Sequence, residues 1–207
     1  DARVSGEWGW VEVNAVRSTV DRRETGQINP NVKSWVAVNP DSELIPVARA
    51  NGVLLAVSAP SGGLLSGQSA VLQLDGWTFE DMTLAPGVGM HLNWPRVSSD
   101  NGRPSASSMK QLRKLFDDAR AYRQARAVEN SQQPVDLRLQ AMLPVLARKQ
   151  PLIVNAQALS AIQGAVAFGE EQDVRVMIYG GYDAPQCAEL LVTKKVQIGR
   201  ASCRERV

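Results

Sequence analysis

The stretch from residue 151 to residue 183 constrains the fold of this chain most strongly. The runs PLIVNA and VRVMIY have the apolar content and the length of buried strands. Between them, residues 157–171 carry apolar side chains at helical spacing, namely Leu159, Ile162, Val166 and Phe168. This pattern predicts a βαβ unit. Because strands that alternate with helices build parallel sheets or barrels, it also predicts an α/β fold.

Polar side chains stand where these two strands should end. Asn155 closes the first run, and Tyr182 follows the second after two glycines. Functional groups of parallel α/β folds lie just past the carboxyl ends of the strands. Asn155 and Tyr182 are therefore candidate pocket residues, whereas Asp183 is expected to cap the helix that follows it.

Further elements are predicted along the chain. Residues 8–16 alternate weakly, as in a strand or an extended lead-in, and residues 17–33 look like a loop. The other expected elements are a short helix at 41–50, a buried strand at 53–59, strands at 71–74 and 89–95, a loop at 98–108, and helices at 109–128 and 136–149. One mixed α/β domain over residues 1–197 is the simplest organisation.

Four other features have both a functional and a structural interpretation. His91, the only histidine, could be a ligand, a substrate contact or a structural residue of its strand. The glycine-rich segment 60–69 could wrap a substrate with backbone N–H groups or simply form a tight turn. Asp75, Glu80 and Asp81 are explained by a turn and a helix start. Cys187, within an apolar helical pattern, is expected to be a buried, inert thiol.

The ends of the chain affect its composition. Residues 198–207, IGRASCRERV, match a translated sequencing adapter and are expected to be an artefact, and the chain is expected to be a fragment open at both ends. Without that tail, 20 basic and 20 acidic residues remain, so no nucleic-acid partner is implied. No apolar run is long enough for a bilayer, so no membrane partner is implied. The compartment, cytoplasmic or periplasmic, and a homo-oligomeric state stay open.

Several long, collinear segments resemble bacterial proteins of the amidohydrolase superfamily, on its imidazolonepropionase-like side. These segments are residues 24–82, GMHLNWP, PLIVNA and VMIYGGYDAPQCAELL. The resemblance implies part of a (β/α)₈ TIM-type, metal-dependent hydrolase barrel. It also implies a small-molecule substrate whose carbon–nitrogen bond, other than a peptide bond, is cleaved by water activated on a divalent metal, zinc being expected. A complete barrel needs roughly 250 residues, so about half of the enzyme is expected to be missing.

The metal ligands that the resemblance implies are largely not in this chain. A His-x-His pair is expected on the first strand, at or just before residues 1–10, where no histidine occurs, and the late aspartate is expected beyond residue 197. Asn155 and Tyr182 replace histidines of the family, and Asn155 is the one metal-ligand candidate. Two hypotheses follow: a hydrolase with Asn155, Tyr182 and His91 at the barrel mouth, or a non-catalytic barrel that binds a ligand or a partner.

Overall fold

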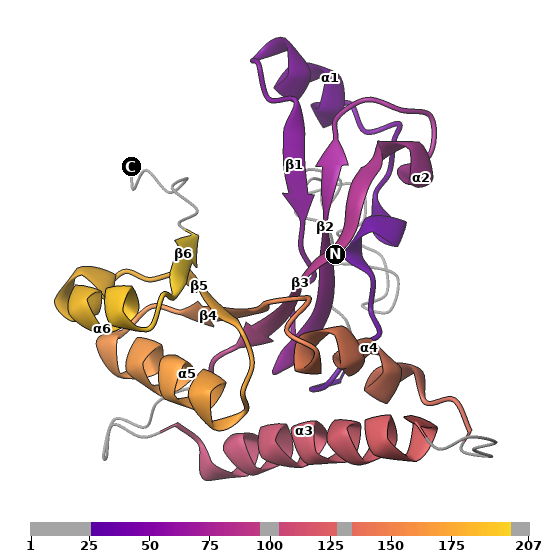
Figure 1. The fold of residues 1–207 in the computed structure, drawn as a ribbon. Helices are drawn as coiled ribbons and strands as arrows, with labels where there is room; N and C mark the ends of the chain where they lie inside the picture. Colours follow the sequence, from indigo (N-terminus) through magenta and orange to yellow (C-terminus); the bar gives the residue numbers. More distant parts are fainter. Residues whose placement is uncertain (1–25, 96–103, 128–133, 200–207) are drawn as a thin grey trace, which may run out of the picture. The chain divides into compact units, whose positions relative to one another are not determined.

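The computed structural model describes residues 26–95, 104–127 and 134–199 (Figure 1). Its chain divides into two compact units, residues 1–91 and 92–207. The strand predicted at residues 8–16 and the first strand expected near residues 1–10 lie outside the described residues. Of the proposed adapter segment, residues 198 and 199 belong to a strand and residues 200–207 lie outside, so its origin stays a prediction.

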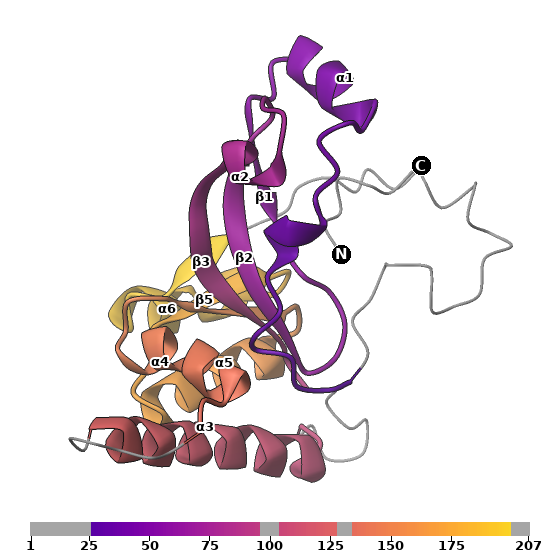
Figure 2. The same cartoon turned by 90° about the vertical axis from the view of Figure 1, so that its right-hand side faces the viewer.

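The first unit is built on antiparallel pairing of β1 with β2. Its elements are η3 (Ser34–Ala37), α1 (Leu44–Ala50), β1 (Leu55–Ser58), β2 (Leu65–Gln73), α2 (Phe79–Met82) and β3 (Thr83–Asn93). Figure 2 shows β2 and β3 side by side as long, curved strands. The last two residues of β3 belong to the second unit, so this strand passes from one unit into the other.

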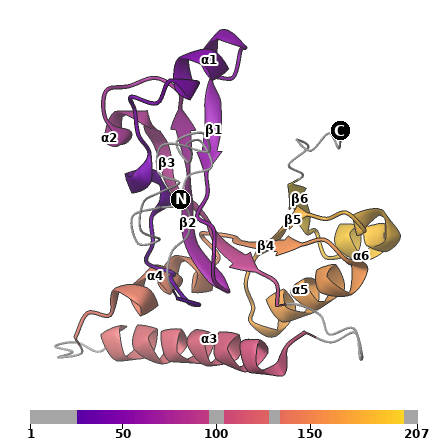
Figure 3. The same ribbon diagram turned by 180° about the vertical axis from the view of Figure 1, so that it is seen from behind.

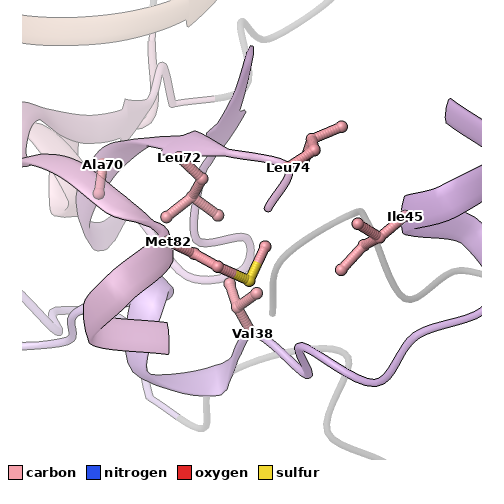
Figure 4. Close-up of a cluster of buried hydrophobic side chains, with 6 residues drawn as sticks. All are labelled: Val38, Ile45, Ala70, Leu72, Leu74 and Met82. Carbon is pink, nitrogen blue, oxygen red and sulfur yellow. The ribbon is translucent and has the colours of Figure 1, made fainter. Parts of the chain in front are cut away.

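One face of this small sheet carries the core of the unit. Figure 4 shows the side chains of Leu72, Met82 and Val38 pointing toward one another. Ala70, Leu74 and Ile45 complete the buried cluster. Thr78 is the N-cap of the short helix α2, and its hydroxyl accepts a hydrogen bond from Asp81 N–H. Glu80 and Asp81 lie in the first turn of this helix, as predicted.

Two predictions for this unit are wrong in part. β1 was expected to be buried, but Leu55 and Val57 are more than half exposed, because β1 pairs on one side only among the described residues. The predicted loop at 60–69 ends early, since β2 already begins at Leu65. Gly67 fits inside that strand with a φ of +130°, where a Cβ would lie 2.7 Å from the carbonyl oxygen of Val32.

The second unit contains the predicted βαβ unit. Its elements are α3 (Ala106–Ala127), α4 (Leu137–Leu146), β4 (Leu152–Ala156), α5 (Leu159–Glu171), β5 (Val176–Gly180), η4 (Ala184–Cys187), α6 (Ala188–Thr193) and β6 (Gln197–Gly199). β4 pairs parallel with β5, and β5 pairs parallel with β6. The six strands follow their sequence order in one sheet, which confirms a mixed α/β fold; the described residues do not close it into a complete barrel. No described helix has the length and apolar character needed to cross a bilayer.

α5 packs closely against the sheet, as Figure 3 shows beneath β4 and β5. Glycines permit this approach: a Cβ on Gly169 would lie 2.4 Å from Val176, and one on Gly164 would lie 2.7 Å from the Trp94 ring. Phe168 fills the space between helices and strand, with its ring edge-to-face against both Trp94 and Phe116 of α3. These aromatic contacts fix α3, α5 and the end of β3 as one core.

The role predicted for Asp183 is wrong. It was expected to cap the helix that follows it, but η4 has no side-chain cap from this residue. Its Oδ2 instead accepts from Leu159 N–H, the first residue of α5, whose own N-cap Ala158 has no side-chain acceptor. The loop after β5 therefore caps the helix that follows β4.

Phe168→Ala should destabilise the second unit by about 3–5 kcal/mol, because the ring is fully buried between two aromatic partners. Phe168→Leu should cost clearly less, since it keeps most of the apolar volume. Urea unfolding measures both. Val192→Ala, on an exposed side chain of α6, is the control and should stay within about 0.5 kcal/mol. A loss for Phe168→Ala no larger than that of the control would contradict this packing.

Candidate functional site

The parallel strands present two chemically different faces. Leu152 and Val154 of β4 and their register partners Val176 and Ile178 of β5 are buried on the face that α5 covers. The alternate residues point to the other face, where Asn155 pairs in register with Tyr179. This second face carries the polar groups at the carboxyl ends of the strands.

Three carboxamides are joined on this face. Gln157 Nε2 donates to Asn155 Oδ1 at 3.2 Å, and Asn155 Nδ2 donates to Asn93 Oδ1 at 3.3 Å. Asn93 ends β3, Asn155 lies near the end of β4, and Gln157 follows that strand directly. We call Asn93, Asn155 and Gln157 the amide row. Asn155 and Gln157 are exposed, so the row is open to a ligand.

The backbone around the amide row is fixed by hydrogen bonds between neighbouring segments. Trp94 N–H donates to Asn155 O at 3.2 Å, and Gly181 N–H donates to Ala156 O at 2.9 Å. Asp183 N–H donates to Gln157 O at 3.0 Å. Gly180, with a φ of +97°, leaves room for the Gln157 side chain, which lies 2.0 Å from where a Cβ would be. The ends of β3, β4 and β5 are thus tied together at the row.

His91 lies two residues before Asn93 on β3, on the same side of that strand by the alternation of side chains. Its Nε2 is buried and has no hydrogen-bond partner among the described residues. Burial lowers the pKa of His91 to about 4 from its ordinary 6.5. The imidazole is therefore neutral at pH 7.

Among the described residues, Tyr182 forms no hydrogen bond with the amide row. Its side chain is 78% exposed in the turn after β5. It lines a separate, largely apolar surface hollow of about 620 Å³ beside α6 and β6. The hollow's other walls include Pro185, Leu191, Val192, Lys195 and Ile198. A pocket shared by Tyr182 and Asn155 stays a prediction, although the chain segments that follow β4 and β5 are hydrogen-bonded to each other.

The remaining predicted candidates have structural roles. Cys187 is buried, as expected, and its thiol donates to Ala184 O. Asp75 forms an ion pair with Arg49, and Asp81 lies in the first turn of α2. Among the described residues, no group of three or more histidine, cysteine, aspartate or glutamate side chains could hold a metal ion.

Sequence reasoning missed Asn93, Gln157 and Tyr179 as members of this face. Gln157 could have been noticed, because it directly follows the strand that contains Asn155. Asn93 has no comparable local signal. Its proximity to Asn155 depends on β3 lying beside β4, across 62 residues of chain.

The fold has a known counterpart. The crystal structure of an amidohydrolase from Thermotoga maritima MSB8 matches this chain with a TM-score of 0.79 at 21% sequence identity, over 94% of this chain. The chain has an amidohydrolase-like fold. It spans about half of that protein, 54% of its length. No family model and no curated protein matches the sequence, and the imidazolonepropionase-like assignment stays a prediction.

Stability should fall in acid partly because of His91. Its folded pKa of about 4 lies below the unfolded 6.5, so the unfolded state binds a proton first as the pH drops. The loss begins near pH 6.5 and is complete near pH 4; at pH 4.5 it amounts to roughly 2–3 kcal/mol. Urea unfolding at pH 8 and pH 4.5 measures it. His91→Gln and His91→Leu should both reduce the pH dependence by that amount, whereas an unchanged pH dependence would show that His91 is not buried as described.

Proposed function

We propose that this chain is part of a hydrolase of the amidohydrolase type, acting on carbon–nitrogen bonds other than peptide bonds in a small-molecule substrate. The observation that carries the proposal is the fold shared with a solved amidohydrolase over 94% of this chain. The amide row supports it, because it stands at the carboxyl ends of parallel strands, where α/β barrels and sheets place their functional groups.

The chain's own residues would bind and orient the substrate. Carboxamides of the amide row can hydrogen-bond both the carbonyl oxygen and the N–H of an amide-like group. His91, the third predicted pocket residue, belongs to the first unit, and its place in the pocket stays a prediction. Fixed, uncharged donors and acceptors position a polar substrate without attracting charged competitors.

If water is activated by a metal, the metal ligands must come from residues other than those described. A catalytic zinc site takes about three ligands from cysteine, histidine or carboxylate side chains and keeps one position for water, and the described residues offer no such cluster of three. Asn155 Oδ1, the predicted ligand, already accepts from Gln157. Asp183, the carboxylate of the adjoining loop, accepts Leu159 N–H and Gln186 Nε2 on its two oxygens. The described residues thus do not form a zinc site.

A second candidate function is a non-catalytic barrel that binds a ligand or a partner. The uncharged character of the amide row favours it, since carboxamides have no proton to transfer near neutral pH. Fold alone does not decide between the two candidates, because one fold carries many functions.

The hydrolase proposal is tested by a hydrolysis screen over cyclic amides and cyclic imides, with dipeptides as the class that should not be cleaved. The screen uses the purified protein and Asn155→Ala. Losing one hydrogen bond to the substrate, about 1.4 kcal/mol, should lower kcat/KM by roughly tenfold. Tyr182→Phe tests the other predicted pocket residue in the same assay. Gln140→Leu, on the exposed face of α4, is the control and should leave turnover unchanged.

Turnover that is reduced in Asn155→Ala and kept in the control would support the hydrolase. Absence of hydrolysis of both cyclic amides and cyclic imides would favour the ligand-binding barrel. Turnover that Asn155→Ala leaves unchanged would mean that the reaction takes place away from the amide row.

A further inference from the structure

The amide row is directional and has an unused end. Each carboxamide donates to the next, from Gln157 through Asn155 to Asn93. Gln157 Nε2 donates within the row, so Gln157 Oε1 is the acceptor at this end of the row. This oxygen accepts no hydrogen bond from the described residues. Gln157 is exposed, so a ligand can reach that oxygen.

The position of this oxygen is set by the protein before any ligand arrives. The backbone oxygen of Gln157 accepts a hydrogen bond from Asp183 N–H. The Gln157 side chain lies over Gly180, which has no Cβ to displace it. Its amide nitrogen is held by Asn155. A side chain that is already oriented loses less conformational entropy when it binds, which raises its contribution to affinity.

The charge around the oxygen selects the kind of ligand. No member of the amide row is ionisable, and both oxygens of Asp183 are engaged in capping α5 and in binding Gln186. A cation would lose its hydration with no carboxylate in the amide row to compensate, and an anion would face a carbonyl-type oxygen. A neutral N–H group satisfies the oxygen at no such cost.

We propose that Gln157 is a specificity-determining residue, whose Oε1 accepts an N–H from an uncharged, imide- or amide-bearing ligand lying along the amide row. The carboxamides of the amide row hydrogen-bond the ligand directly. Asn155 orients Gln157 and does not bind a metal. The inference rests on the proposed function, which places the ligand at the strand ends. It concerns how the ligand binds and not how it is turned over.

Two matched probes test the proposal on the purified protein. Succinimide carries an N–H between two carbonyl groups, whereas N-methylsuccinimide has the same ring without that N–H. Titration calorimetry should show that the protein binds succinimide at least fivefold more tightly than N-methylsuccinimide. Gln157→Leu should abolish that preference, and Gln157→Glu, which keeps an acceptor oxygen, should retain part of it.

Gln140→Leu is the matched control, because it makes the same substitution at an exposed helix position, and it should keep the full preference. Equal binding of the two probes by the unmodified protein, or a preference that survives Gln157→Leu, would overturn the proposal. Circular dichroism of Gln157→Leu confirms that the variant folds. A preference for succinimide without hydrolysis of any substrate would support this inference while the hydrolase proposal fails.

Discussion

The hydrogen bonds between the loops after β4 and β5 are the constraint on which the candidate site depends. Gly181 and Asp183 donate their backbone N–H groups to Ala156 and Gln157, and the Asp183 side chain caps α5. Helix α5 has no side-chain cap of its own, so the second loop completes the start of the helix that follows the first strand. Strand, helix and loops are thereby fixed together, and Asn155 and Gln157 are fixed with them.

The rest of the second unit supports this arrangement through close packing. Gly164 and Gly169 let α5 approach the strands, and Phe168 fills the interior beside them. Leu152, Val154, Val176 and Ile178 lie on the helix-covered face, and on the other face Asn155 and Tyr179 follow the apolar pair Ile153 and Met177 toward the strand ends. The alternation of side chains along the strands thus places the helix contacts and the strand-end polar groups on opposite faces.

The sequence predicted the βαβ unit well, because apolar runs and helical spacing are local signals. It could not predict which strand lies at an edge, so β1 was expected to be buried, although Leu55 and Val57 are exposed. It placed Asn155 at a strand end, where β4 does end, but a pocket shared by Asn155 and Tyr182 stays a prediction, because it depends on side-chain direction and not on local sequence. The role of Asn93 could not be predicted from the sequence, because strand pairing brings it next to Asn155 from a distant part of the chain.

The central claim is that the strand ends of this chain present hydrogen-bonding carboxamides and not metal ligands. Anomalous diffraction at the zinc edge, from crystals of the protein grown with zinc, tests it most directly. The account predicts no anomalous peak at coordination distance, about 2.0–2.2 Å, from Asn155 Oδ1 or Gln157 Oε1. A zinc peak coordinated by either oxygen would contradict the account and make the amide row part of a metal centre.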